Sequence, residues 1–195
     1  IAHHLIWTAY GFWLPNDPRG SMSKVICDKQ VASLGPRHYG RKPIQPAWSE
    51  VRRFRQSASE ILKNSLLKLD DGDAHCVAGS FQKVIRQRRY TCYACAIMPD
   101  HVHLLVRRHR DLGDAMIEHF QRESALALFG EGRRPADHPV WGGKGWAVFQ
   151  NTLRDVRRII DYIRNNPVKI GRPVQEWDFV QPYDDWLPGG HPERR

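Results

Sequence analysis

Two histidines stand two residues apart in the stretch "MPDHVHLLV", which runs from Met98 to Val106. In a β-strand alternate side chains point to the same face, so the imidazoles of His101 and His103 project from one side, with their backbones about 6 to 7 Å apart. Two imidazoles placed in this way can bind a single metal ion. The pattern is short, and it is also compatible with solvated histidines on an open sheet face or with histidines that hydrogen-bond to their neighbours.

A tyrosine and an asparagine stand four residues apart in the stretch "IIDYIRNNPVKIG". On a helix, Tyr162 and Asn166 lie on one face one turn apart, and Arg158 lies one turn earlier. A phenol can act as a nucleophile, an amide oxygen can bind a hard metal ion, and an arginine can steady a phosphate. Alternatively, Tyr162 lies at the edge of the core, Asn166 ends the helix before Pro167, and Arg158 is a simple surface residue.

Taken together, the two stretches resemble the motifs of single-tyrosine HUH transposases, in particular the subgroup of REP-associated tyrosine transposases. "MPDHVHLLV" is similar to the HUH strand, and "DYIRNNPVK" is similar to the tyrosine helix. One helix and one strand are expected between them, as in that family. The opening "IWTAYGFWLPNDPRGS" also looks like the first strand and loop of the group. The resemblance covers most of residues 1–171 and is weaker in the long insertion and after Gly171.

This resemblance implies a metal-dependent nuclease and strand transferase that acts on single-stranded DNA able to fold into hairpins. By this resemblance His101 and His103 bind a divalent Mg or Mn ion, Asn166 is the third ligand, and Tyr162 is the nucleophile. Attack by the phenol gives a 5′-phosphotyrosine and a free 3′-hydroxyl, and the retained bond energy allows rejoining without ATP. Several relatives have Gln at the third position, so the shorter Asn166 leaves ligation through a water open.

The charge of the chain favours a polyanionic partner. Lys and Arg number 30 against 21 Asp and Glu, which gives a formal net charge of +9 and a pI near 9.7. Arginine forks suit phosphate oxygens, although any single basic cluster can also be a solvated face. The arginines that we select as DNA-binding candidates are Arg107, Arg108, Arg154 and Arg158. Loop tryptophans that could stack on bases, or simply pack, are Trp13, Trp48, Trp141, Trp146 and Trp186.

Hydrophobic periodicity and turn residues predict an α+β fold. Strands are expected at 3–11, 90–98, 101–107 and 146–149, and helices at 48–64, 71–89, 111–130 and 152–166, with a further short strand at 65–69. Ser49 and Thr152 are the expected N-caps of two helices. The order matches a ferredoxin-like βαββαβ core, an antiparallel sheet with helices on one face, followed by a C-terminal helix that bears the tyrosine and an irregular tail.

The domain prediction is one HUH transposase domain over residues 1–171, with a loop and helix insertion at about 14–64, and an irregular tail over 172–195. No stretch is long and apolar enough to span a membrane, so we expect a soluble cytoplasmic protein without a membrane partner. The spacing of Cys92 and Cys95 on a strand predicts side chains on opposite faces, which disfavours a zinc or redox pair. The resembling family includes monomers and homodimers, and the sequence does not choose between them.

Two other functions stay open at this point. A basic nucleic-acid-binding module without catalysis would keep the charge and use the histidines only structurally. A zinc hydrolase would use His101 and His103 as ligands and attack with water. A covalent protein–DNA adduct that depends on Tyr162 separates the transposase from both.

Overall fold

The four strands form one antiparallel sheet in the computed structural model, which describes residues 1–21, 23–26, 28–40 and 42–188. The strands are Ala2–Thr8 (β1), Cys92–Ile97 (β2), His101–Arg107 (β3) and Trp146–Gln150 (β4), in the order β2-β3-β1-β4. Helix α3 (Asp71–Arg88) lies between β1 and β2 along the chain, and α4 (Gly113–Gly130) lies between β3 and β4. The predicted βαββαβ order and α+β class are therefore confirmed.

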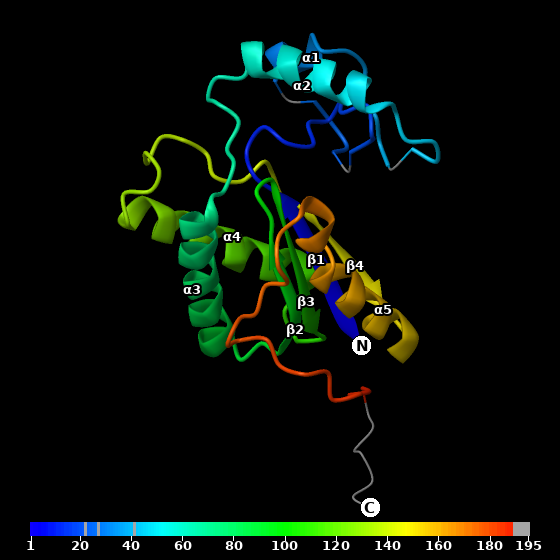
Figure 1. Ribbon diagram of the computed structural model, residues 1–195, viewed down its shortest axis with the longest axis vertical. Helices are drawn as coiled ribbons and strands as arrows, with labels where there is room; N and C mark the ends of the chain where they lie inside the picture. The colour runs from blue at the N-terminus through cyan, green and yellow to red at the C-terminus, as the bar shows by residue number, and fades with distance from the viewer. Residues whose placement is uncertain (22, 27, 41, 189–195) are drawn as a thin grey trace, which may run out of the picture.

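The helices lie in two layers, one on each side of the sheet (Figure 1). Helices α3 and α4 contact each other and cover one face, whereas α5 (Leu153–Arg164) packs on the opposite face against β2 and β3. Short α1 (Lys29–Ala32) and α2 (Trp48–Ile61) belong to the insertion, which lies beyond one end of the sheet. The helix after the core was predicted, and its place on the other face gives the sheet two apolar layers.

Alternate side chains of strand β3 pack against the two helix layers on opposite faces of the sheet. Val102, Leu104 and Val106 are fully buried in the cluster beneath α3 and α4. Leu105 belongs to the smaller cluster beneath α5. Because side chains alternate along a strand, His101 and His103 share the face of Leu105 and are presented to α5. The sheet face that carries the histidine pair is thus the face that the tyrosine helix covers.

A β-bulge in β2 changes the positions of the two cysteines. The pairing register with β3 shifts between Cys92 and Ala94, so Tyr93 and Ala94 both join the cluster under α5. Cys92 and Cys95 consequently both lie in the cluster under α3 and α4, as free thiols. The prediction that they face opposite sides was wrong, because a bulge inserts one residue into the alternation. Burial raises the pKa of the Cys92 thiol to about 12, so the pair stays protonated.

Two local predictions, one at the beginning of α2 within the insertion and one just after the insertion, differ from the structure. Helix α2 begins at Trp48, and its N-cap Ala47 makes no side-chain cap bond, so the Ser49 cap was wrong. Trp48 is helical and lies 5.3 Å from the guanidinium of Arg55, a cation–π contact that favours the earlier start. Residues 65–69 form no strand, because their buried leucines make only isolated backbone hydrogen bonds to loops. The Thr152 cap is confirmed by its bond from the Asp155 amide, 3.1 Å.

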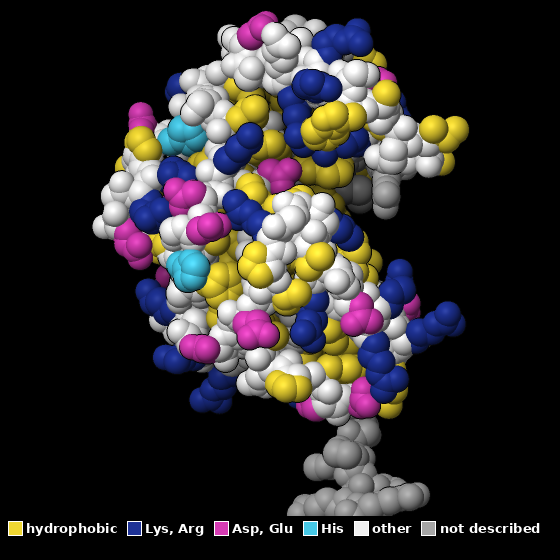
Figure 2. Space-filling model, viewed as in Figure 1, with side chains coloured by type: hydrophobic (Ala, Val, Ile, Leu, Met, Phe, Trp, Pro, Cys, Tyr) yellow, Lys and Arg dark blue, Asp and Glu magenta, His cyan; other side chains and the backbone are white. Residues whose placement is uncertain are grey.

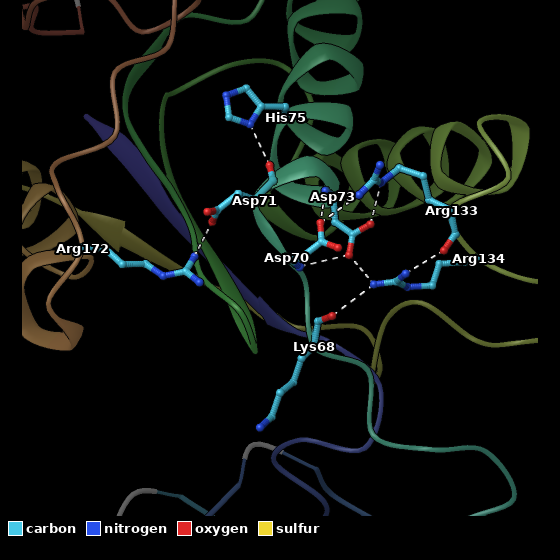
Figure 3. Close-up of polar contacts among 8 residues, drawn as sticks. All are labelled: Lys68, Asp70, Asp71, Asp73, His75, Arg133, Arg134 and Arg172. Carbon is cyan, nitrogen blue, oxygen red and sulfur yellow. Dashed lines mark hydrogen bonds and ion pairs between the residues drawn. The ribbon is translucent and has the colours of Figure 1, made fainter.

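A buried carboxylate holds the beginning of α3 against the segment after α4 (Figure 3). Asp73 is fully buried and accepts hydrogen bonds from Arg133 Nε, at 2.7 Å, and from Arg134. Asp70 caps the helix through the Asp73 amide, 2.7 Å, and also binds Arg133. A buried charge is tolerated only when it is paired, so two arginines on one carboxylate fix this corner of the molecule.

The segment after α5 runs along the outer edge of β2. The amide of Gln175 makes two hydrogen bonds, both 2.8 Å, to the backbone N–H and C=O of Ile97. Further on, Val180 forms a parallel bridge with Cys92, and Arg107 stacks over the ring of Trp186 at 3.9 Å. In the ranges that the structure describes, which leave out residues 22, 27, 41 and 189–195, no helix has the length and apolarity needed to cross a bilayer.

Candidate active site

The histidine pair lies at the end of the sheet nearest to the insertion. The imidazole centroids of His101 and His103 are 4.8 Å apart, with the rings nearly perpendicular. His103 is buried, at 5% exposure, while His101 is partly open. The Nδ1 atom of His101 lies 2.6 Å from the carboxylate of Asp100 in the preceding turn. The predicted shared face is therefore observed, and the two rings are close enough to act on one group.

The tyrosine helix brings Tyr162 directly to these rings. The centroid of the phenol ring lies 5.4 Å from that of His103, and Tyr162 remains 42% exposed. The apolar side of α5, with Val156, Ile159 and Ile163, fills the cluster on the sheet and leaves Tyr162 at its edge. The phenol is therefore held beside the histidine pair of its own chain and stays accessible to a substrate.

Asn166 follows at the end of the same helix. It is buried, at 7% exposure, and its Nδ2 donates to the backbone C=O of Tyr162 at 3.1 Å. With the amide nitrogen engaged in this way, the amide oxygen is the atom left for another partner. Lys169 Nζ lies 4.3 Å from the centroid of the Tyr162 ring and adds a positive charge to this end of the helix.

A third histidine, which the sequence did not single out, completes the group. His4 on β1 is 5% exposed, and its Nε2 lies 3.0 Å from Nδ1 of His103. Its ring centroid is 6.1 Å from that of Tyr162. No signal in the sequence identified it, because the pairing of Ile6 with His103 in the β1–β3 register is what places His4 on the same face.

These groups line one cleft of about 560 Å³ between α5, the sheet and the insertion. Figure 2 shows the molecule hollowed between its upper part, the insertion, and the body below. Trp13, Ser21 and Gln45 also line the cleft, and Trp146 of β4 lies beside them on the same sheet face as His103. The cleft thus combines the titratable groups of the sheet and α5 with aromatic surfaces and short polar side chains.

Trp13 is held in position by its neighbours. It adopts a φ of 55°, which is uncommon for a residue other than glycine, and its ring is covered by the Arg19 guanidinium at 4.0 Å. Arg19 is itself fixed by two hydrogen bonds to the Asp17 carboxylate, 2.9 and 2.6 Å. Trp146 contacts Trp13 edge to face, with ring centroids 6.5 Å apart. The two tryptophan rings, which we call the aromatic wall, are therefore held in place by contacts within the protein.

Burial keeps the inner histidines neutral. It lowers the pKa of His4 to about 4. Burial, with the nearby His101, His4 and Lys169, holds the pKa of His103 well below its ordinary value. Although burial alone would raise the pKa of Asp100, its hydrogen bond to His101 and the charges of His101 and Arg55 hold it below the usual range. The site therefore contains two neutral imidazoles, those of His4 and His103, and an ionised Asp100 carboxylate beside His101.

The donor set fits a weakly held divalent ion completed by a substrate. No cluster of three or more His, Cys, Asp and Glu side chains placed to hold a metal occurs in the described part of the chain. The cleft instead offers the imidazoles of His4, His101 and His103 and the amide of Asn166. Imidazole and amide oxygen form a mixed set, to which phosphate oxygens can add the hard ligands that Mg or Mn prefers. His101, His103 and Asn166 would hold such an ion.

The four candidate arginines lie in different places. Arg158 lines the cleft and also contacts Asp155 on its own helix at 3.2 Å, whereas Arg154 is exposed one turn earlier and is not in the cleft wall. Arg107 stacks on Trp186 near the far end of β3. Arg108 lines a separate surface hollow together with Arg88, Arg89 and Arg110. The structure therefore brings only Arg158 to the histidine pair.

Comparisons with solved structures found similarity to two transposases. No family model matches the sequence, and no curated protein matches it either. One solved structure, a REP-associated tyrosine transposase bound to a REP hairpin, is 23% identical with a TM-score of 0.44, over 56% of this chain. The match spans 64% of that protein's own length. Another, a putative transposase from Deinococcus radiodurans R1, is 13% identical with a TM-score of 0.38 and covers 89% of this chain and 92% of that one.

Proposed function

We propose that this protein is a metal-dependent transposase that nicks and rejoins hairpin-forming single-stranded DNA through a 5′-phosphotyrosine. The observation that carries the proposal is the contact between Tyr162 and His103, with ring centroids 5.4 Å apart, in an accessible cleft that His101 also lines. An exposed phenol next to two imidazoles and a buried amide is a site for phosphoryl transfer. The sequence motifs and the positions of these residues in the fold both support the proposal.

In the proposed reaction Tyr162 is the nucleophile. Its oxygen attacks the phosphorus of one phosphodiester in line with the 3′ oxygen, an O–P bond to the tyrosine forms, and the bond from phosphorus to the 3′ oxygen breaks. The phenol proton leaves to solvent, and the leaving oxygen takes up a proton to become a 3′-hydroxyl. Rejoining reverses these steps with an incoming 3′-hydroxyl. A divalent ion, bound by His101, His103 and Asn166, would supply charge stabilisation to the phosphate oxygens.

The aromatic wall and the positive charge support a single-stranded substrate. Unpaired bases expose their faces and can stack on Trp13 and Trp146, at about 1–3 kcal/mol per base. Arg158, in the same cleft, can contact a phosphate next to the attacked one. A paired base cannot offer its face to a side chain without leaving the duplex. This chemistry favours a substrate whose reacting phosphate lies in an unpaired segment beside a hairpin.

An adduct assay tests the proposal. The protein is incubated with end-labelled hairpin DNA and Mn, and the products are separated under denaturing conditions. Wild type is expected to give a covalent adduct, Tyr162→Phe none, and Tyr39→Phe, which alters an exposed tyrosine of the insertion, the wild-type amount. Hydrolysis without an adduct would indicate a water-using hydrolase instead. Binding without cleavage would indicate a non-catalytic module.

A further inference from the structure

His4 occupies a place in the site that the proposed reaction does not use. It comes from β1, the strand beside β3, and is buried between the sheet and α5. Its Nε2 meets Nδ1 of His103 at 3.0 Å, and its ring also packs against Tyr162. A buried imidazole in contact with both a proposed ligand and the proposed nucleophile requires an explanation beyond filling space.

The contact between the two imidazoles constrains their protons. Each neutral imidazole carries one N–H and one lone pair, so a hydrogen bond between two of them has a single proton. If His4 donates, His103 is left with its N–H on Nε2 and has no lone pair there for a metal. If His103 donates from Nδ1, its Nε2 lone pair is free. The direction of this one hydrogen bond therefore decides whether His103 can act as a ligand.

His101 shows the same arrangement with an unambiguous direction. Its Nδ1 lies 2.6 Å from the carboxylate of Asp100, which can only accept while ionised. The proton must therefore be on Nδ1, which leaves Nε2 as the ring nitrogen that can bind a metal. Metal-binding histidines commonly donate their second ring N–H to such an outer partner, which fixes the tautomer and the ring orientation. In the described residues, His4 is the hydrogen-bond partner that the structure gives to Nδ1 of His103.

We propose that His4 is a positioning residue: its Nε2 accepts the Nδ1 proton of His103 and so fixes the Nε2 lone pair of His103 for a divalent cation. His4 and Asp100 then form a matched pair of outer partners, one for each histidine of the strand. The inference rests on the proposed function, since it assigns His103 as a ligand. It adds a residue that the strand and helix motifs do not contain.

Nuclear magnetic resonance reads the tautomer without metal or DNA. Long-range ¹H–¹⁵N correlation of the histidine rings is expected to show the proton of His103 on Nδ1 in the wild type. His4→Leu removes the acceptor and is expected to release this preference, whereas His4→Gln keeps an acceptor and is expected to retain it. The matched control is His3→Leu, because His3 is the preceding residue of β1 and its ring packs against Phe149.

Cobalt titration, followed by visible absorption, measures the consequence. His4→Leu is expected to weaken Co(II) binding about 10- to 100-fold, His4→Gln much less, and His3→Leu not measurably. A wild-type His103 protonated on Nε2 overturns the inference. So does a His4→Leu protein that binds cobalt as His3→Leu does.

The two proposals can fail separately. A wild type with the expected tautomer and cobalt affinity but no Tyr162 adduct would refute the transposase and leave the role of His4 in place. An adduct that forms equally in wild type and His4→Leu at limiting metal would support the transposase and refute the role of His4. A wild type that binds no cobalt even when hairpin DNA is present overturns both.

Discussion

His4 also links the site to the stability of the folded chain. Its pKa is about 4 in the folded protein and about 6.5 in an unfolded one. Above that range His4 is neutral in both the folded and the unfolded chain. As pH falls below about 6.5, His4 binds a proton in the unfolded chain but stays unprotonated in the folded chain. The free energy of unfolding should therefore decrease between about pH 6.5 and 4, by about 3 kcal/mol from this residue.

Urea unfolding from about pH 7.5 down to about pH 4.5 measures this dependence. His4→Gln is expected to show a smaller loss than the wild type over the same range, because its side chain does not titrate. Equal pH dependence in the two proteins would contradict the assignment of His4 as a buried neutral imidazole.

Asn166 offers a second test at the level of one side chain. Asn166→Leu removes the amide oxygen that we assign to the metal while keeping a similar volume, and should weaken Mn-dependent adduct formation by at least about tenfold. Asn166→Gln keeps the oxygen and should be less impaired. Asn165→Leu, at the neighbouring exposed position, is the control. The measurement is the Mn concentration that gives half-maximal adduct.

The chemistry-bearing residues were predictable to the extent that they lie in local patterns. The i, i+2 spacing placed His101 and His103 on one face, and the i, i+4 spacing placed Tyr162 beside Asn166. His4 was not predictable, because its role depends on which strand pairs with β3 and in which register. Arg107 and Arg108 were selected for charge alone, and charge does not tell which end of a strand a side chain occupies.

At the level of elements, the corner at the beginning of α3 should be a point of high sensitivity. Asp73→Asn leaves Arg133 and Arg134 without their buried carboxylate and weakens the helix cap, so we expect a loss of about 3 kcal/mol in the free energy of unfolding. Asp71→Asn, two residues earlier, alters a side chain that is 82% exposed and should cost less than about 1 kcal/mol. Chemical denaturation of the two variants provides the comparison.

The sequence predicted the order of the elements better than their details. Strong periodicity fixed the helices α3, α4 and α5, since each has a face that must be buried. The bulge in β2 was missed because the residues on both faces of that strand are apolar and buried. An inserted residue therefore does not disturb any alternation of polar and apolar residues in the sequence. The predicted strand at 65–69 failed for a related reason: buried leucines also occur in extended loops.

At the level of the whole molecule, the site is assembled from one chain. His4, His103 and Tyr162 contact one another without a second copy. A mixture of His103→Ala and Tyr162→Phe proteins should therefore form no adduct above the sum of the two separate proteins, because neither chain holds a complete site. Adduct at the wild-type level in the mixture would show that the tyrosine is supplied by a partner.

Charge on the whole molecule is less concentrated than the sequence clusters indicated. Figure 2 shows Lys and Arg side chains spread over the visible face and mixed with Asp and Glu. Arginines in the basic runs "RRFR", residues 52–55, and "RDVRR", residues 154–158, form ion pairs within the protein, as Arg55 does with Asp100 and Arg157 with Asp185. Net charge was readable from composition, whereas its distribution depended on these tertiary pairs.

The segment that runs along β2 has a consequence for self-association. A sheet edge with unpaired backbone groups is a template on which a foreign strand can add. Gln175 and Val180 occupy that edge at β2, so in the described chain the outer side of β4 is the place where such addition could begin. Ending the chain before Gln175 would expose the backbone groups of β2 as a second template, and light scattering should then report slow aggregation that the unshortened chain resists.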